Sequence, residues 1–199
     1  MAKVLSKNQK ITVYAIFSAV IILLSFLPIK TLGLEITLTM VPIAVGAICF
    51  GSGAGLIFGT VFGVVSFLQC VTGYSPFGAM LLGINPFFTF LMCVPTRMLT
   101  GFLTGVIYKG IDRILPKISK MISSLLCPLL NTLFFMGTLT ALFYNEKEIA
   151  DIATSLGAVN PVSFIILFVG INGLVELICG FVAAYPASTA LSKYLKIKE

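Results

Sequence analysis

Six apolar stretches, several of them long enough to cross a lipid bilayer, make up most of this sequence. They cover about residues 11–28, 36–50, 54–70, 86–108, 121–144 and 162–184. Only 10% of the 199 residues are charged, whereas a soluble domain carries about 25%. A helix of about 20 apolar residues spans the hydrocarbon core of a membrane. The sequence therefore predicts an all-α membrane protein, with residues 1–199 forming one integral-membrane domain of six transmembrane helices.

The charged residues outside these stretches predict the orientation of the helices. With six spans, both termini and the loop at residues 109–120 share one side, which is strongly basic. The other side is mixed and holds fewer positive charges. Lysine and arginine favour cytoplasmic loops, so we expect both termini in the cytoplasm of a bacterial cell and the protein in its plasma membrane. The basic side carries Lys3, Lys7, Lys10, Lys109, Arg113, Lys117, Lys120, Lys193, Lys196 and Lys198. The other side carries Lys30 and Lys147 with Glu35, Glu146, Glu148 and Asp151.

This distribution also supports the short second span. If residues 36–70 formed a single crossing, the basic loop at residues 109–120 would lie outside. The formal net charge of +6 is thus a signal of topology. A nucleic-acid partner would need a basic groove with aromatic residues, and the sequence shows none, so we expect membrane lipid and no nucleic acid around the chain.

Several residue types that enzymes need are missing. The chain has no histidine, the usual general base and metal ligand. Its five cysteines are odd in number and unclustered, as packing residues would be. No G-x-x-x-x-G-K-[ST] phosphate loop is present. We therefore predict no catalytic residues, no metal site and no cofactor, and we expect that a partner supplies energy for any transport.

Arg97 and Glu176 are the two charged residues that lie deep inside apolar stretches. An ionised group at membrane depth costs about 3 kcal/mol or more. At 1.5 Å per residue, Arg97, Asn131, Asn172 and Glu176 all lie about 15–21 Å below the outer surface. Asn172 and Glu176 are four residues apart and so share a helix face. Four polar side chains from three helices are thus predicted to form one layer.

Two interpretations of this layer remain open. In one, Arg97 and Glu176 form a buried ion pair that holds helices together. In the other, the layer is the floor of a small-molecule pocket that opens to the outside. Gln69, Tyr74 and Asn85 lie nearer the outer surface and are further candidates for ligand contacts. The charge-free connection at residues 71–85 is expected to lie back over the bundle.

The second and third stretches carry a glycine pattern. Gly51, Gly55, Gly59 and Gly63 recur every four residues. Small residues at this spacing form a smooth stripe on a helix, which another helix can approach closely.

Together these residues resemble the substrate-binding S components of energy-coupling factor (ECF) vitamin transporters. The run LTMVPIAVGAICFGSGAGLIFGT at residues 38–60 is similar to the second and third helices of that family. Ala15-x-x-x-Ala19 matches its small-residue docking motif, and Asn131, Asn172 and Glu176 match recurring polar positions. The resemblance implies a vitamin ligand, a transmembrane scaffold subunit that meets Ala15 and Ala19, and two ATPase subunits.

The substrate is less constrained than the family. Ser66-Phe-Leu-Gln followed by Ser75-Pro-Phe looks most like the pantothenate-type S components, and an anionic ligand would bind Arg97. Riboflavin, cobalamin and folate remain alternatives.

Three hypotheses come from other classes of protein: a self-sufficient secondary transporter, an intramembrane enzyme and a purely structural membrane subunit. The missing histidine argues against the enzyme.

Overall fold

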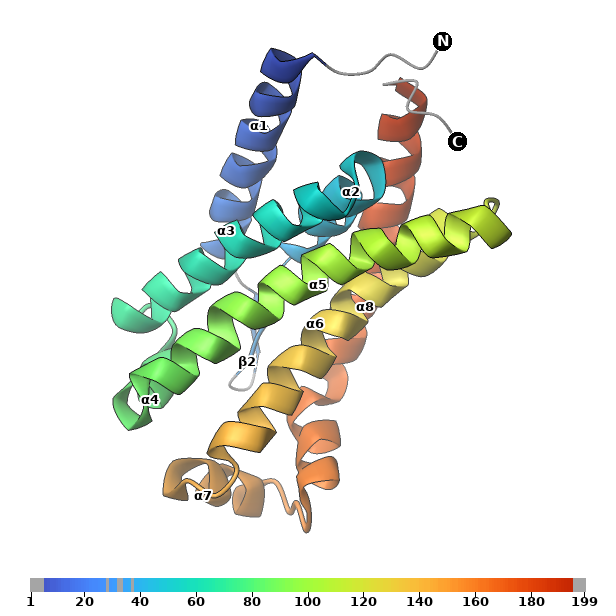
Figure 1. Ribbon diagram of the computed structural model, residues 1–199. Helices are drawn as coiled ribbons and strands as arrows, with labels where there is room; N and C mark the ends of the chain where they lie inside the picture. Colours follow the sequence, from blue (N-terminus) through green and yellow to red (C-terminus); the bar gives the residue numbers. More distant parts are fainter. Residues whose placement is uncertain (1–5, 28, 32–33, 37, 195–199) are drawn as a thin grey trace.

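The computed structural model describes residues 6–27, 29–31, 34–36 and 38–194 as a helical bundle with one short β-hairpin (Figure 1). The predicted all-α class is confirmed, and the hairpin is the exception to it within the described part. The helices are α1 (Lys7–Ser25), α2 (Met40–Phe50), α3 (Ser52–Val71), α4 (Pro76–Ile84), α5 (Pro86–Ile114), α6 (Ser119–Phe143), α7 (Lys147–Ser155) and α8 (Pro161–Tyr194). The hairpin pairs β1 (Ile29–Thr31) with β2 (Leu34–Ile36) in antiparallel register.

Five described helices are long and apolar enough to cross a membrane, one fewer than the six spans predicted. The difference lies in α2, which has 11 residues because Ile36 belongs to β2 and the helix begins only at Met40. Nine of these residues are buried, since α2 contacts α1, α3, α5, α6 and α8. A helix enclosed by protein need not match the thickness of the hydrocarbon core.

The last helix also differs from its predicted span at residues 162–184. Gly170 has φ 42° and ψ −134°, which interrupts α8 and leaves Gly173–Tyr194 as the long apolar segment. This backbone conformation is accessible almost only to glycine. Hydropathy runs unbroken through the kink, so the composition of the stretch carries no sign of it.

The glycine stripe lies between α3 and α5, which contact each other more extensively than any other pair of described helices. In Figure 1 these two helices run diagonally, side by side. A Cβ atom added to Gly55 would lie 2.1 Å from the carbonyl oxygen of Gly101, and one added to Gly63 would lie 2.8 Å from Cα of Val94. The predicted close approach of another helix is therefore confirmed, and that helix is α5. Gly51, with φ 90°, forms the tight turn between α2 and α3.

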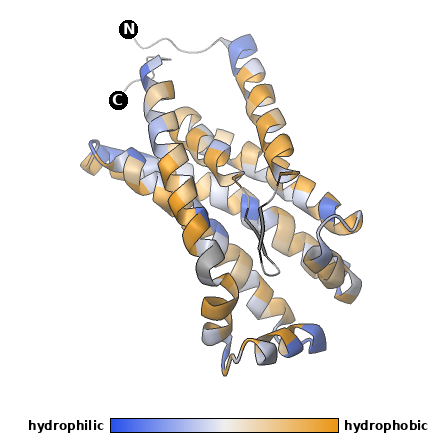
Figure 2. Cartoon of the chain, turned by 180° about the vertical axis from the view of Figure 1, so that it is seen from behind, coloured by the Kyte–Doolittle hydropathy of each residue, from blue (hydrophilic) through white to orange (hydrophobic). Residues whose placement is uncertain are grey.

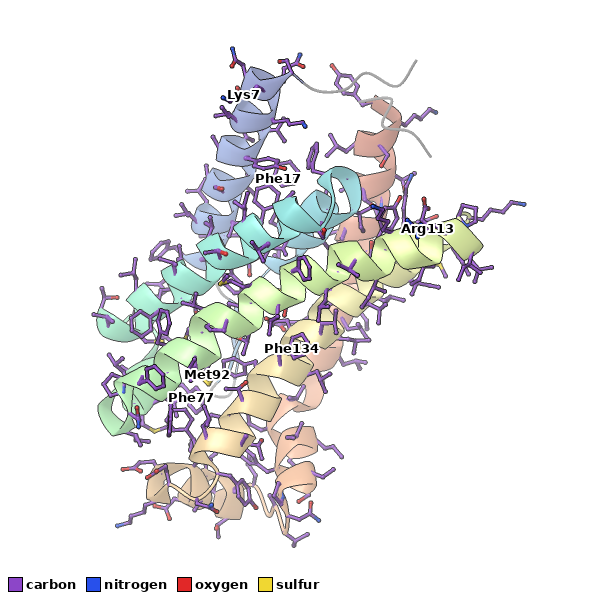
Figure 3. All side chains as sticks on the ribbon, in the orientation of Figure 1. Lys7, Phe17, Phe77, Met92, Arg113 and Phe134 are labelled. Carbon is purple, nitrogen blue, oxygen red and sulfur yellow. The ribbon has the colours of Figure 1, made fainter. Side chains whose placement is uncertain are left out.

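The distribution of side chains agrees with a bundle embedded in lipid. Hydrophobic residues cover the middle of the long helices, and hydrophilic residues gather at ends such as the start of α1 and at α7 (Figure 2). Lys7 and Arg113 lie toward one end of the bundle, while Phe77 and Met92 lie toward the other (Figure 3). The start of α1 and the end of α8 lie at the same end of the bundle (Figure 1).

Two apolar clusters form the core, one in each half of the bundle. We name them by the predicted topology. The inner core contains Ile21, Met40, Ile43, Ala44, Val45, Ile48, Cys49, Ala54, Phe58, Phe62, Cys127 and Ala184. The outer core contains Cys70, Leu81, Met92, Cys93, Val94, Met136, Leu139, Phe143, Ile149, Ala153 and Phe164. Leu81 belongs to α4, so the connection at residues 71–85 folds back onto the bundle as predicted.

Candidate ligand-binding site

Arg97 lies on α5 where the inner and outer cores meet, with 8% of its surface exposed. Its Nη1 donates to the carbonyl oxygens of Cys93 at 3.1 Å and Met92 at 3.4 Å. Its Nε is buried and has no hydrogen-bond partner among the described residues. The side chain thus folds back along its own helix toward the outer half, in the direction that helical side chains favour.

The sequence around Arg97 contains a break in the backbone hydrogen-bond pattern. Pro95 lies inside α5 and has no N–H group, so the carbonyl group of Leu91, four residues before it, lacks its helical donor. The hydroxyl group of Thr96 donates to the carbonyl of Met92, which Arg97 also contacts. Side-chain donors therefore reinforce the helix where proline weakens it.

Two aromatic rings flank the guanidinium group. Its Cζ lies 4.6 Å from the ring centroid of Phe62 on α3 and 5.4 Å from that of Phe135 on α6. A cation over an aromatic face at these distances is attracted by the ring. Within the described part of the chain, the contacts of Arg97 are with carbonyl groups and rings, and none is an ion pair with Glu176.

The structure brings Asn131 to the same region. Asn131 and Phe135 are four residues apart on α6 and share the helix face that meets Arg97. The Oδ1 atom of Asn131 is buried and has no hydrogen-bond partner within the part of the chain that the structure describes. A donor at Arg97 Nε and an acceptor at Asn131 Oδ1 are therefore both unmatched, which is uncommon for buried polar atoms.

Glu176 lies at the level of Asn131 on the next helix. Gly180 of α8 packs on Pro128 of α6, where an added Cβ would lie 3.3 Å from the proline ring. Because the two helices run in opposite directions, Glu176, one turn before Gly180, comes beside Asn131. Glu176 is half-buried there. The side chain of Asn172 lies outside the described residues, so the full four-residue layer stays a prediction.

Gln69, Tyr74 and Asn85 all make hydrogen bonds that hold helix ends. Gln69 Nε2 donates to the Ser25 carbonyl at 2.8 Å, and the Tyr74 hydroxyl donates to the Phe26 carbonyl at 3.0 Å. Asn85 caps α5, since its Oδ1 accepts from a backbone N–H in the first turn at 3.1 Å. These contacts hold helix ends at the predicted outer surface, and we call Gln69, Tyr74 and Asn85 the rim. Ligand contacts by these three residues stay a prediction.

Ala15 and Ala19 are exposed on α1, which packs mainly on α3 and α2 among the described helices. Their face is accessible to another protein, and the predicted docking role stays a prediction.

The sequence reasoning did not identify Phe62 or Phe135 near Arg97. Phe135 lies one turn after Asn131 on the same helix face, and this spacing could have indicated that Phe135 also faces Arg97.

Chemically, this arrangement can bind an anion. It offers a fixed positive charge with an unused donor, flanked by apolar rings. No group of three or more histidine, cysteine or acidic residues suitable for a metal ion occurs among the described residues.

Comparison with known proteins supports a relationship over most of the chain. The profile of the family described as "ECF transporter, substrate-specific component" matches residues 9–188. The solved structure of ThiT from Listeria monocytogenes is similar, with a TM-score of 0.65 and 18% sequence identity over 92% of this chain and 95% of that one. At this identity the likeness concerns the fold alone. No curated protein sequence gives a significant match.

Proposed function

Because the chain belongs to the family of ECF transporter substrate-specific components, we propose that it captures a vitamin or vitamin-like small molecule outside the cell and delivers it inward with an ATPase-driven module. Members of this family bind transport substrates and are not enzymes. The fold shared with ThiT supports a multi-pass membrane protein. The pocket and its ligand are inferred from the side chains described above.

The observation that carries the proposal is the buried guanidinium group of Arg97. A buried charge is stable when it is paired and fully hydrogen-bonded. Rings and two carbonyl groups stabilise Arg97 in part, but no side chain or carbonyl group of the described residues accepts from its Nε–H. A ligand carboxylate would supply both the acceptor and the opposite charge.

Pantothenate is the vitamin we favour. It combines a carboxylate with an amide N–H and hydroxyl groups, so it can accept from Arg97 and donate to the unmatched Oδ1 of Asn131. Its apolar methyl groups can pack against aromatic side chains. Another vitamin with an anionic group would satisfy Arg97 equally, so the identity of the ligand requires direct measurement.

The first experiment identifies the ligand. The protein is purified from its native membrane, and co-purifying small molecules are analysed by mass spectrometry. Isothermal titration of pantothenate, riboflavin, cobalamin, folate and thiamine then follows, without ATP or an ion gradient. We expect one of them to bind. Binding of none, together with gradient-driven uptake into vesicles lacking an ATPase, would instead indicate a secondary transporter.

The second experiment tests the site. A hydrogen bond to a charged group contributes about 1.5–3 kcal/mol, so Arg97→Gln should weaken binding roughly 10- to 100-fold. Arg113→Gln is the matched control, because Arg113 lies on the same helix and is exposed. Unchanged affinity in Arg97→Gln would show that Arg97 only stabilises the bundle.

A third experiment tests the partner. Ala15→Leu and Ala19→Leu enlarge the exposed face of α1 without reaching the pocket residues. We expect these variants to bind ligand normally and to lose co-purification with the scaffold and ATPase subunits. Loss of ligand binding together with normal co-purification would contradict the assignment of this face.

A further inference from the structure

Cys70 and Cys93 bring two thiol groups into contact between α3 and α5. Their Sγ atoms are 3.8 Å apart, and the residues are 4% and 1% exposed. The Cys70 thiol also contacts the Ser66 carbonyl at 3.2 Å, and the Ser66 hydroxyl lies 3.9 Å from Cys93 Sγ. The described thiols are all free.

The position of this pair within the bundle distinguishes it from the other cysteines. Cys70 is one residue from the outer end of α3, and Cys93 is in the outer half of α5. Cys49, Cys127 and Cys179 lie in the halves of their helices that the predicted topology places toward the cytoplasm. Disulfides form and persist mainly on the extracytoplasmic side of the membrane, and the predicted topology places the two outer cysteines nearer that side.

The pair also sits at a junction of three helices. A Cβ atom added to Gly78 of α4 would lie 2.3 Å from Cys70 Sγ, so α4 rests directly on this thiol. On the opposite side, the carbonyl group of Cys93 accepts a hydrogen bond from Arg97. A covalent bond here would join α3 to α5 beneath α4 and next to the candidate ligand site.

We propose that Cys70 and Cys93 are a modification site, at which a small oxidant converts the two thiols into a reversible disulfide. In the reaction with the azo compound diamide, the two thiols lose two protons and two electrons. An S–S bond forms, and the N=N bond of diamide is reduced to a hydrazine. The sulfur atoms must approach from 3.8 Å to the bond length of about 2.05 Å. A dithiol reductant reverses the change by thiol–disulfide exchange.

The test counts thiols in the full-length protein. Purified protein is treated with diamide, the oxidant is removed, and the chain is denatured and labelled with a maleimide before intact-mass analysis. The reduced protein should carry five labels, and oxidation of the pair should leave three, because five minus two is three. Dithiothreitol should restore all five labels.

Variants identify the pair. Cys93→Ser should carry four labels both before and after diamide, and Cys70→Ser gives the same readout should Cys93→Ser fail to fold. Cys127→Ser is the matched control and should fall from four labels to two. Five labels after diamide, a covalent dimer on a non-reducing gel, or a loss of two labels that persists in Cys93→Ser would each overturn the proposal.

Discussion

Replacing Gly59 by alanine would directly test the contact between α3 and α5 that positions Arg97. An ideal Cβ at Gly59 would lie 2.2 Å from the carbonyl oxygen of Arg97 and 2.9 Å from the carbonyl carbon. Cβ atoms in real structures essentially never come closer than 3.0 Å, so the oxygen contact alone must lengthen by 0.8 Å (3.0 minus 2.2). Backbone lies on both sides of this contact, so no side-chain rotation can relieve it.

The cost follows from overpacking. Insertion of a methyl group into a well-packed interface costs about 1–3 kcal/mol, and we expect the upper end because the neighbouring Gly55–Gly101 contact must open as well. Alanine in place of glycine returns up to about 1 kcal/mol of helix propensity. The net loss is about 2 kcal/mol, which lowers the ratio of folded to unfolded protein about 30-fold.

The assay is the unfolding midpoint in detergent, measured for Gly59→Ala beside Gly137→Ala. Gly137 lies within α6, and an added Cβ there meets no atom within 4 Å, so this control should be as stable as the parent or slightly more stable. Ligand affinity should fall in Gly59→Ala because Arg97 moves with α5. Equal stability of the two variants would refute the argument that the glycine stripe determines the position of α5.

Four further predictions concern the rim, the kink and the topology. Asn85→Ala removes the cap of α5 and should lower the free energy of unfolding by about 1 kcal/mol, whereas Asn85→Ser should retain most of it; equal loss in both would show that capping is not its role. Tyr74→Phe loses one hydrogen bond, so amide hydrogen exchange at the end of α1 should become faster by a factor corresponding to about 1 kcal/mol. Gly170→Ala should cost about 1–3 kcal/mol in unfolding measurements, because its φ of 42° is unfavourable for alanine. Lys147→Cys should react with an impermeant maleimide in intact cells, and Lys117→Cys should react only after permeabilisation; the reverse pattern would contradict the predicted orientation.

The site illustrates how far sequence reasoning extends. Depth along a helix follows from a rise of 1.5 Å per residue, so the sequence predicts Arg97, Asn131 and Glu176 at one level. The contact of Arg97 with Phe135 shows that the face of α6 that carries Asn131 is turned toward Arg97. The direction in which a side chain points around the helix axis, and therefore the residue that it contacts, depends on which helices pack beside it. The sequence therefore left open whether Arg97 meets Glu176, and the described contacts are with Phe62 and Phe135 instead.

The rim residues show the same limit. Gln69 and Tyr74 were selected because they are polar and lie near the outer surface. Gln69 and Tyr74 donate hydrogen bonds to carbonyl groups at the end of α1, more than 40 positions away in the chain. A free carbonyl at a helix end is a common partner for a polar side chain, but its location is known only when the helices are packed.

The sequence by itself determined that this chain is a membrane-embedded helical bundle, which end of it is basic, and that one face of the third apolar stretch can approach another helix closely. These properties depend on hydropathy, charge and glycine spacing, which are local. The tertiary structure decided that this helix is α5, that α2 begins only at Met40 and is surrounded by protein, and that α8 breaks at Gly170. It also decided that the Arg97 guanidinium lies between two aromatic rings with one donor unused. These features depend on contacts between residues distant in the chain, and their energies are set by packing and not by composition.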